Sequence, residues 1–99
     1  MSEDRRSHKR VSIMLPVKWE AMSGSHEART EDISLSGCFV NTSLRAELAE
    51  VASLEIQLPS GEWLPLKGEV TSYQPGIGFG VLFSLLTDDQ EDALKKLLE

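Results

Sequence analysis

The chain has 99 residues, of which 40% are apolar, enough for one modest hydrophobic core and too few for a second. Its formal charge of −6 argues against general nucleic-acid binding, where a basic surface supplies most of the affinity. No apolar run approaches the ~20 residues of a transmembrane helix, and the charged residues 1–10 lack the apolar stretch of a secretory signal. The single cysteine, Cys38, excludes an intramolecular disulfide, so we expect a cytoplasmic protein without membrane insertion.

The charge is unevenly distributed along the chain. Residues 1–18 carry five Lys or Arg against two Asp or Glu, whereas residues 19–99 carry five against fourteen. A small cationic arm on an acidic body suits a small anionic ligand better than a polymer, although an ordinary solvated tail would have the same composition. We expect residues 1–10 to form a flexible basic arm and residues 11–99 to form a single domain.

Alternation of apolar and polar residues predicts one strand in the first half of the chain, and turn residues delimit two more. The first covers residues 11–21, where every second residue from Val11 to Ala21 is apolar. Pro16 lies on its opposite face and implies an edge position or a bulge. After the turn at residues 23–25, further strands are expected over residues 27–33 and 38–41.

The second half predicts a short helix, three more strands and a C-terminal helix. Leu44, Leu48 and Val51 share helical spacing, so a short helix is expected over residues 44–50. Alternation predicts strands over residues 54–58, 64–70 and 77–83. A capping-box spacing at Thr87 to Gln90 begins a helix over about residues 87–99. Six short strands with frequent turns predict an all-β fold, an antiparallel barrel or sandwich, with a short C-terminal α-helix.

The first candidate binding motif is the basic hexapeptide Arg5-Arg6-Ser7-His8-Lys9-Arg10, directly before the first predicted strand. Guanidinium groups donate in a planar fork to phosphate oxygens, and the same plane stacks on purine rings. Because Arg6 and Arg10 are four residues apart, the arm must fold around a ligand for both to reach it. Basic hexapeptides are common, so a solvated tail is the competing interpretation.

The second candidate motif is Asp32-Ile33-Ser34-Leu35-Ser36-Gly37, at the end of the second predicted strand. A carboxylate accepts two N–H donors at once and therefore complements the donor edge of guanine. The Ser34 hydroxyl adds a donor or acceptor, and Gly37 permits positive φ and close backbone approach. The competing interpretation is purely local, because Asp and Ser cap turns that a glycine completes.

The two motifs in this order, Arg6-x-x-x-Arg10 and then Asp32-x-Ser34-x-x-Gly37, resemble those of the PilZ domain family. The resemblance extends from Arg5 through the glycine-rich stretch at residues 76–81 and Phe83. It implies a six-stranded antiparallel barrel that binds the bacterial second messenger cyclic di-GMP, with no further cofactor. The arginines would grip phosphates and stack on guanine, and the second motif would line the guanine pocket. The ligand-binding residues expected from the resemblance are Arg5, Arg6, Arg10, Asp32, Ser34 and Gly37.

The expected function is therefore a receptor or adaptor module. Its N-terminal arm would change conformation when cyclic di-GMP binds and would thereby regulate a protein partner. The alternative is an adaptor of the same fold that needs no ligand. Single-stranded nucleic-acid binding is a weaker idea, because the acidic body opposes it.

Other chemistry-bearing residues predict little beyond these motifs. His8 could contact a phosphate and Tyr73 could stack on a base, but exposure and packing respectively are their ordinary alternatives. His8, His26 and Cys38 lack the spacing of a metal site. Acidic residues near position 90 suit a helix N-terminus. No nucleophile stands with a base, so we do not expect an enzyme.

Overall fold

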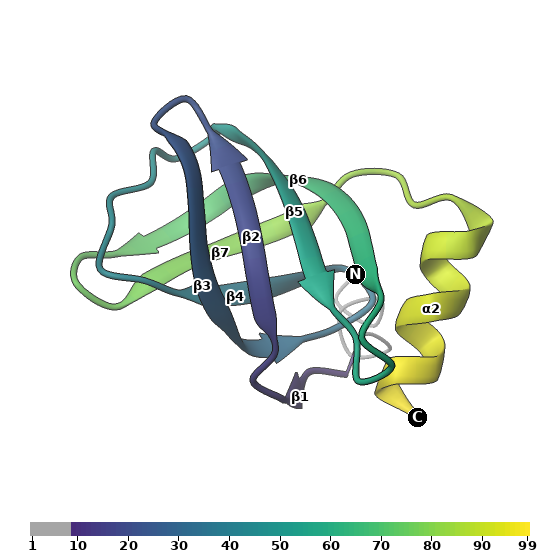
Figure 1. The fold of residues 1–99 in the computed structure, drawn as a ribbon. Helices are drawn as coiled ribbons and strands as arrows, with labels where there is room; N and C mark the ends of the chain where they lie inside the picture. The colour runs from purple at the N-terminus through teal and green to yellow at the C-terminus, as the bar shows by residue number, and fades with distance from the viewer. Residues whose placement is uncertain (1–8) are drawn as a thin grey trace.

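A computed structural model describes residues 9–99, and residues 1–8, most of the expected arm, lie outside the described part. Strands and one helix follow one another along this part of the chain (Figure 1). In chain order they are β1 (Val11–Ser12), β2 (Pro16–Ala21), β3 (Gly24–Ile33), β4 (Gly37–Asn41), β5 (Val51–Gln57), β6 (Trp63–Gln74), β7 (Gly78–Phe83) and α2 (Asp88–Leu98).

Six of these strands close into an antiparallel barrel. The hydrogen-bonded order is β3-β2-β5-β6-β7-β4, and β4 pairs back onto β3, which closes the sheet. The two-residue β1 is an additional strand that pairs with the end of β3, through Val11 opposite Ile33 and Ser12 opposite Asp32. The predicted six-stranded antiparallel barrel is confirmed, with one short strand added.

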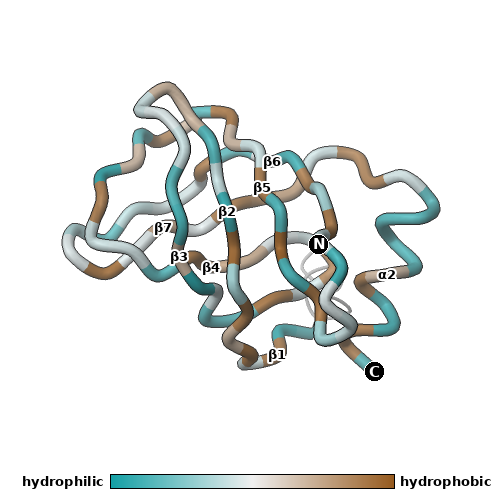
Figure 2. The backbone as a smooth tube through the Cα atoms, in the orientation of Figure 1, coloured by the Kyte–Doolittle hydropathy of each residue, from teal (hydrophilic) through white to brown (hydrophobic). Residues whose placement is uncertain are grey.

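The core fills the barrel through the alternation on which the strand predictions rest. Val17 and Trp19 on β2 and Leu54 and Ile56 on β5 are each at most 1% exposed. Figure 2 shows hydrophobic and hydrophilic residues alternating along these strands. The Trp19 ring packs edge-on against Phe79 of β7, with ring centroids 4.8 Å apart. Side chains from opposite walls of the barrel therefore meet in one core.

The expected strand over residues 11–21 is interrupted, and buried Thr30 accounts for the break. The Thr30 hydroxyl accepts a hydrogen bond from the Leu15 amide at 3.0 Å and donates one to the Ile13 carbonyl at 2.7 Å. These side-chain bonds stand beside two backbone bonds, from Ile13 to the Glu31 carbonyl and from Thr30 to the Leu15 carbonyl, and residues 13–15 are not in a regular strand. Pro16, which has no amide hydrogen to donate, begins β2 directly after this irregularity.

The helix expected over residues 44–50 is wrong. This segment is an irregular connection between β4 and β5, and Ala49 within it has a left-handed φ of 69°. Leu44, Leu48 and Val51, whose spacing suggested the helix, are 42%, 64% and 65% exposed. Ala46 is the residue of this segment that enters the core.

The C-terminal helix is confirmed and packs beside the barrel (Figure 1). Thr87 caps it: its hydroxyl accepts from the Gln90 amide while the Gln90 side chain accepts from the Thr87 amide. Gln90 also donates to the Pro65 carbonyl of β6 at 2.8 Å, and Leu94 is fully buried. Within residues 9–99, no helix combines the length and apolar composition needed to cross a membrane.

Candidate functional site

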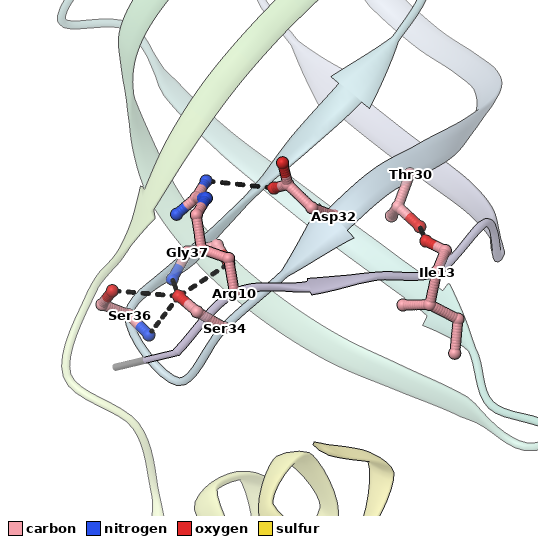
Figure 3. Close-up of polar contacts among 7 residues, drawn as sticks. All are labelled: Arg10, Ile13, Thr30, Asp32, Ser34, Ser36 and Gly37. Atoms are coloured by element: carbon pink, nitrogen blue, oxygen red, sulfur yellow. Dashed lines mark hydrogen bonds and ion pairs between the residues drawn. The ribbon is translucent and has the colours of Figure 1, made fainter. Parts of the chain in front are cut away.

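The turn between β3 and β4 is built around the Ser34 hydroxyl. Ser34 Oγ accepts from the Ser36 and Gly37 amides at 3.1 and 3.2 Å, and the Ser34 amide donates to the Gly37 carbonyl at 2.8 Å (Figure 3). Ser34 is 0% exposed. Its hydroxyl is therefore engaged in the turn, as the local interpretation of the motif expects.

Gly37 is required for close backbone packing rather than for an unusual backbone angle. A Cβ atom at this position would overlap the Val81 carbonyl oxygen of β7, the strand paired with β4. Gly37 is not among the residues with positive φ, so that part of the expectation is wrong. The expected close approach exists, and β7 is the neighbour that makes it. Ser34 and Gly37 thus fix the end of β3 where Asp32 projects.

Arg10 and Asp32 bring the two motifs together at one point on the barrel wall. Arg10 Nη2 lies 3.1 Å from Asp32 Oδ1, and the two side chains are 51% and 27% exposed. Figure 3 shows the guanidinium pointing toward the carboxylate across the end of β3. Their proximity follows from the pairing of β1 with β3, because Arg10 directly precedes β1.

The Asp32 carboxylate retains unused acceptor capacity. Although Oδ1 lies within ion-pair distance of Arg10, it is buried and accepts no well-aligned hydrogen bond from the described residues. An ionised carboxylate has about four acceptor positions. Because Oδ1 is enclosed while 27% of the Asp32 side chain is exposed, a ligand would reach the carboxylate through its other oxygen, and most of the five Arg10 N–H donors remain available to an anion.

The charges of Asp32 and Arg10 act on the buried thiol of Cys38. Burial, and secondarily the negative charge of Asp32, raises the pKa of Cys38 from 9.0 to about 12, against the opposing positive charge of Arg10. Such a thiol stays protonated at neutral pH, so it is a core residue and not a nucleophile. The prediction that Cys38 packs in the third expected strand is confirmed.

The other residues singled out in the sequence lie elsewhere or outside the described chain. Arg5, Arg6 and His8 fall within residues 1–8 and are not placed. Tyr73 is opposite buried Phe79 and packs against the core, so the structure does not bring it to Asp32. Among residues 9–99, no three His, Cys, Asp or Glu side chains gather as metal ligands would.

Two residues near the site were not considered from the sequence. Thr30 holds the chain between β1 and β2 and so maintains the strand that carries Arg10 to Asp32. The sequence signal for Thr30 was its place on the inward face of β3, because a buried hydroxyl needs hydrogen-bond partners. Phe39 lies opposite Asp32 on β4 and is half-buried. Three apolar residues in succession, at positions 38–40, gave no indication of which of them faces outward.

A closed barrel with an exposed guanidinium beside an acceptor-rich carboxylate defines a small binding module. The chain belongs to the PilZ domain family, whose model matches residues 4–99. Domains of this family are non-catalytic and are typically receptors for cyclic di-GMP. The family therefore confirms the expectation of a binding module rather than an enzyme.

Solved structures show the same fold. The PilZ domain of CeSA from a cellulose-synthesizing bacterium is 25% identical and superposes with a TM-score of 0.72, over 90% of this chain and 93% of that one. The inhibitor of motility MotI/DgrA from Bacillus subtilis is 18% identical with a TM-score of 0.73, over 95% of this chain and 49% of that one. The likeness to MotI/DgrA concerns the fold, and this chain corresponds to about half of that protein. No curated protein matches the chain.

Proposed function

We propose that the protein is a receptor for cyclic di-GMP that uses the Arg10–Asp32 pair as the centre of its binding site. The observation that carries the proposal is the 3.1 Å approach of these two side chains from separate motifs. A guanidinium that can grip a phosphate and a carboxylate that can hold a guanine edge lie side by side. The proposed ligand contains both groups.

Binding would exchange one set of contacts for another. In the free protein Arg10 neutralises Asp32; in the complex the guanidinium turns to a phosphate while Asp32 accepts N–H donors of guanine. Arg5 and Arg6 would add donors to the same phosphates. Ser34 and Gly37 would act through the turn that aims Asp32, because the Ser34 hydroxyl is buried and already bonded.

Such an exchange would couple ligand binding to the N-terminal arm. Arg10 belongs to the basic segment that precedes β1, so a new partner for its guanidinium changes where that segment is held. The rearranged arm, the ligand and the adjoining barrel wall would together form a surface that a protein partner recognises. Nucleic acid and membrane insertion have no part in this function.

Titration calorimetry with cyclic di-GMP tests the proposal. Arg10→Ala and Asp32→Ala should each weaken binding by roughly tenfold to a hundredfold, as expected for loss of hydrogen bonds to charged groups. Arg45→Ala is the matched control, because Arg45 forms a comparable exposed ion pair with Glu47 away from the proposed site. Undiminished affinity in both site variants would place the ligand elsewhere.

A ligand-independent adaptor is the rival function, and thermal unfolding separates the two. A ligand that binds only the native state must raise the melting temperature. The proposal therefore expects a rise with cyclic di-GMP that exceeds any rise with cyclic di-AMP or GTP. An unchanged melting temperature at millimolar cyclic di-GMP would favour the adaptor.

A further inference from the structure

We infer that Phe39 is a further ligand-binding residue: its ring supplies an apolar platform on which a guanine base stacks while Asp32 holds the edge of that base. The inference rests on the proposed function and adds a residue outside both sequence motifs. It concerns the row of residues that runs across the outer barrel wall from β3 to β7.

Phe39 and Asp32 lie on the same outer face of the barrel. They are direct partners in the β3–β4 ladder, and directly opposite side chains on one face stand about 4.5–5.5 Å apart at their Cβ atoms. The flanking residues of β4, Cys38 and Val40, are each 0% exposed and point into the core, so Phe39 points outward. A half-buried aromatic ring therefore adjoins the carboxylate proposed to bind guanine.

Gly78 of β7 makes room for this ring. A Cβ atom at Gly78 would lie 2.8 Å from Phe39 Cε2, which is too close for carbon atoms. A Cβ atom at Gly80 would lie 3.8 Å from Phe39 Cδ1, an ordinary contact, so Gly80 also adjoins the ring. Because Gly78 carries no side chain, the ring can lie close to the backbone of β7.

A ring lying against a strand has one face covered by backbone and leaves the other accessible to a ligand. Phe39 is half-buried, as this arrangement requires. A planar base could then stack on the ring while its edge reaches the exposed part of the neighbouring Asp32 carboxylate, whose side chain is 27% exposed. Base–aromatic stacking and edge recognition act in perpendicular directions, so both contacts can be made at once.

The test compares Phe39→Leu with Phe39→Trp by titration with cyclic di-GMP. Leucine keeps an apolar cover over the glycines but loses the stacking face, so affinity should fall about fivefold to a hundredfold. Tryptophan keeps a stacking face and should bind within a few-fold of the parent protein. Trp63→Leu is the matched control, because Trp63 is an outer-face aromatic on β6, outside the Asp32–Phe39 row.

A spectroscopic measurement excludes a merely structural effect. In the complex, Phe39 ring protons should give nuclear Overhauser contacts to guanine H8, and that proton should move upfield relative to free ligand. Both effects should vanish in Phe39→Leu, whose circular dichroism and melting curve establish folding.

The outcomes separate this inference from the proposed function. If Asp32→Ala abolishes binding but Phe39→Leu binds like the parent without loss of the H8 shift, the platform is wrong and the receptor stands. If the parent protein fails to bind cyclic di-GMP, both are wrong. A retained H8 shift in Phe39→Leu would assign the stacking to another group.

Discussion

The Asp32 carboxylate affects the interior of the barrel as well as its surface. Its charge reaches Cys38 through the barrel wall, where burial has already raised the pKa of the thiol. Ile33, the neighbour of Asp32 on β3, lies opposite Cys38 on β4. The charge of Asp32 therefore acts on a core residue of the neighbouring strand. The dependence of the free energy of unfolding on alkaline pH therefore reports on the burial of Cys38.

The free energy of unfolding should fall as pH rises above 9. The pKa of Cys38 is raised from 9.0 to about 12, so below pH 9 the thiol is protonated in both states. Between these values the unfolded chain loses the proton and the native protein keeps it, which costs at most about 1.4 kcal/mol per pH unit. Urea unfolding at several pH values measures this slope.

Cys38→Ala removes the titrating group and should show a shallower decline over the same pH range. Lysine and tyrosine titration is common to both proteins and cancels in the comparison. Equal slopes for the two proteins would contradict the burial of a protonated thiol.

At the scale of elements, the connection between β1 and β2 determines the position of Arg10. The Thr30 hydroxyl bridges the Ile13 carbonyl and the Leu15 amide, and two backbone hydrogen bonds, from Ile13 to Glu31 and from Thr30 to Leu15, join the same segment to β3. The strand that positions Arg10 is only two residues long, so this bridge supports it. A core-facing hydroxyl thereby supports the proposed binding face on the outer side of the wall.

Thr30→Val should destabilise the protein by about 1–3 kcal/mol, because it leaves a buried amide and a carbonyl without a partner. Thr30→Ser keeps the oxygen and should be distinctly more stable than Thr30→Val in urea unfolding. In conditions where both variants are folded, Thr30→Val should also bind cyclic di-GMP more weakly than Thr30→Ser. Equal stability and affinity of the two variants would argue against the bridge.

The strands could be predicted because burial of one face makes apolar and polar residues alternate along the sequence, as in residues 17–19 and 54–56. The failed helix at residues 44–50 shows the limit of spacing alone. Its three apolar residues are largely exposed, and a seven-residue segment has too little intrinsic helical stability to fold without packing.

The approach of the two motifs could be predicted only in part from the sequence. The sequence spacing placed Asp32 at a strand end and Arg10 before a strand, yet only the register of β1 on β3 brings them together. The role of Ser34 depended on which atoms surround its hydroxyl. Phe39 gained its significance from glycines on a strand distant in sequence, which alternation within β4 cannot reveal.

For the whole molecule, a cationic segment precedes an acidic body. Residues 1–18 have an excess of Lys and Arg, and residues 19–99 have fourteen acids against five bases. A doubly anionic ligand would be attracted by the first and repelled by the second. Net attraction at the proposed site therefore depends on short-range contacts with the arginines, and salt should weaken it.

Raising the salt concentration from 0.1 to 1 M shortens the Debye length from about 10 Å to about 3 Å. The dissociation constant for cyclic di-GMP should consequently rise over this range in calorimetric titrations. Arg10→Ala should show a smaller rise, because one screened contact is already gone. If the affinity of the parent protein does not depend on salt, the arginines do not bind the ligand phosphates as proposed.

Strand β1 pairs with the end of β3, which β2 does not reach. Residues 16–21 of β2 pair with residues 24–29 of β3, and β1 takes over opposite Asp32 and Ile33. Shortening the protein through Ser12 would unmask backbone donors and acceptors there, inviting a strand from a second copy to pair in its place. Variants shortened through Ser12 are therefore expected to associate through the uncovered end of β3.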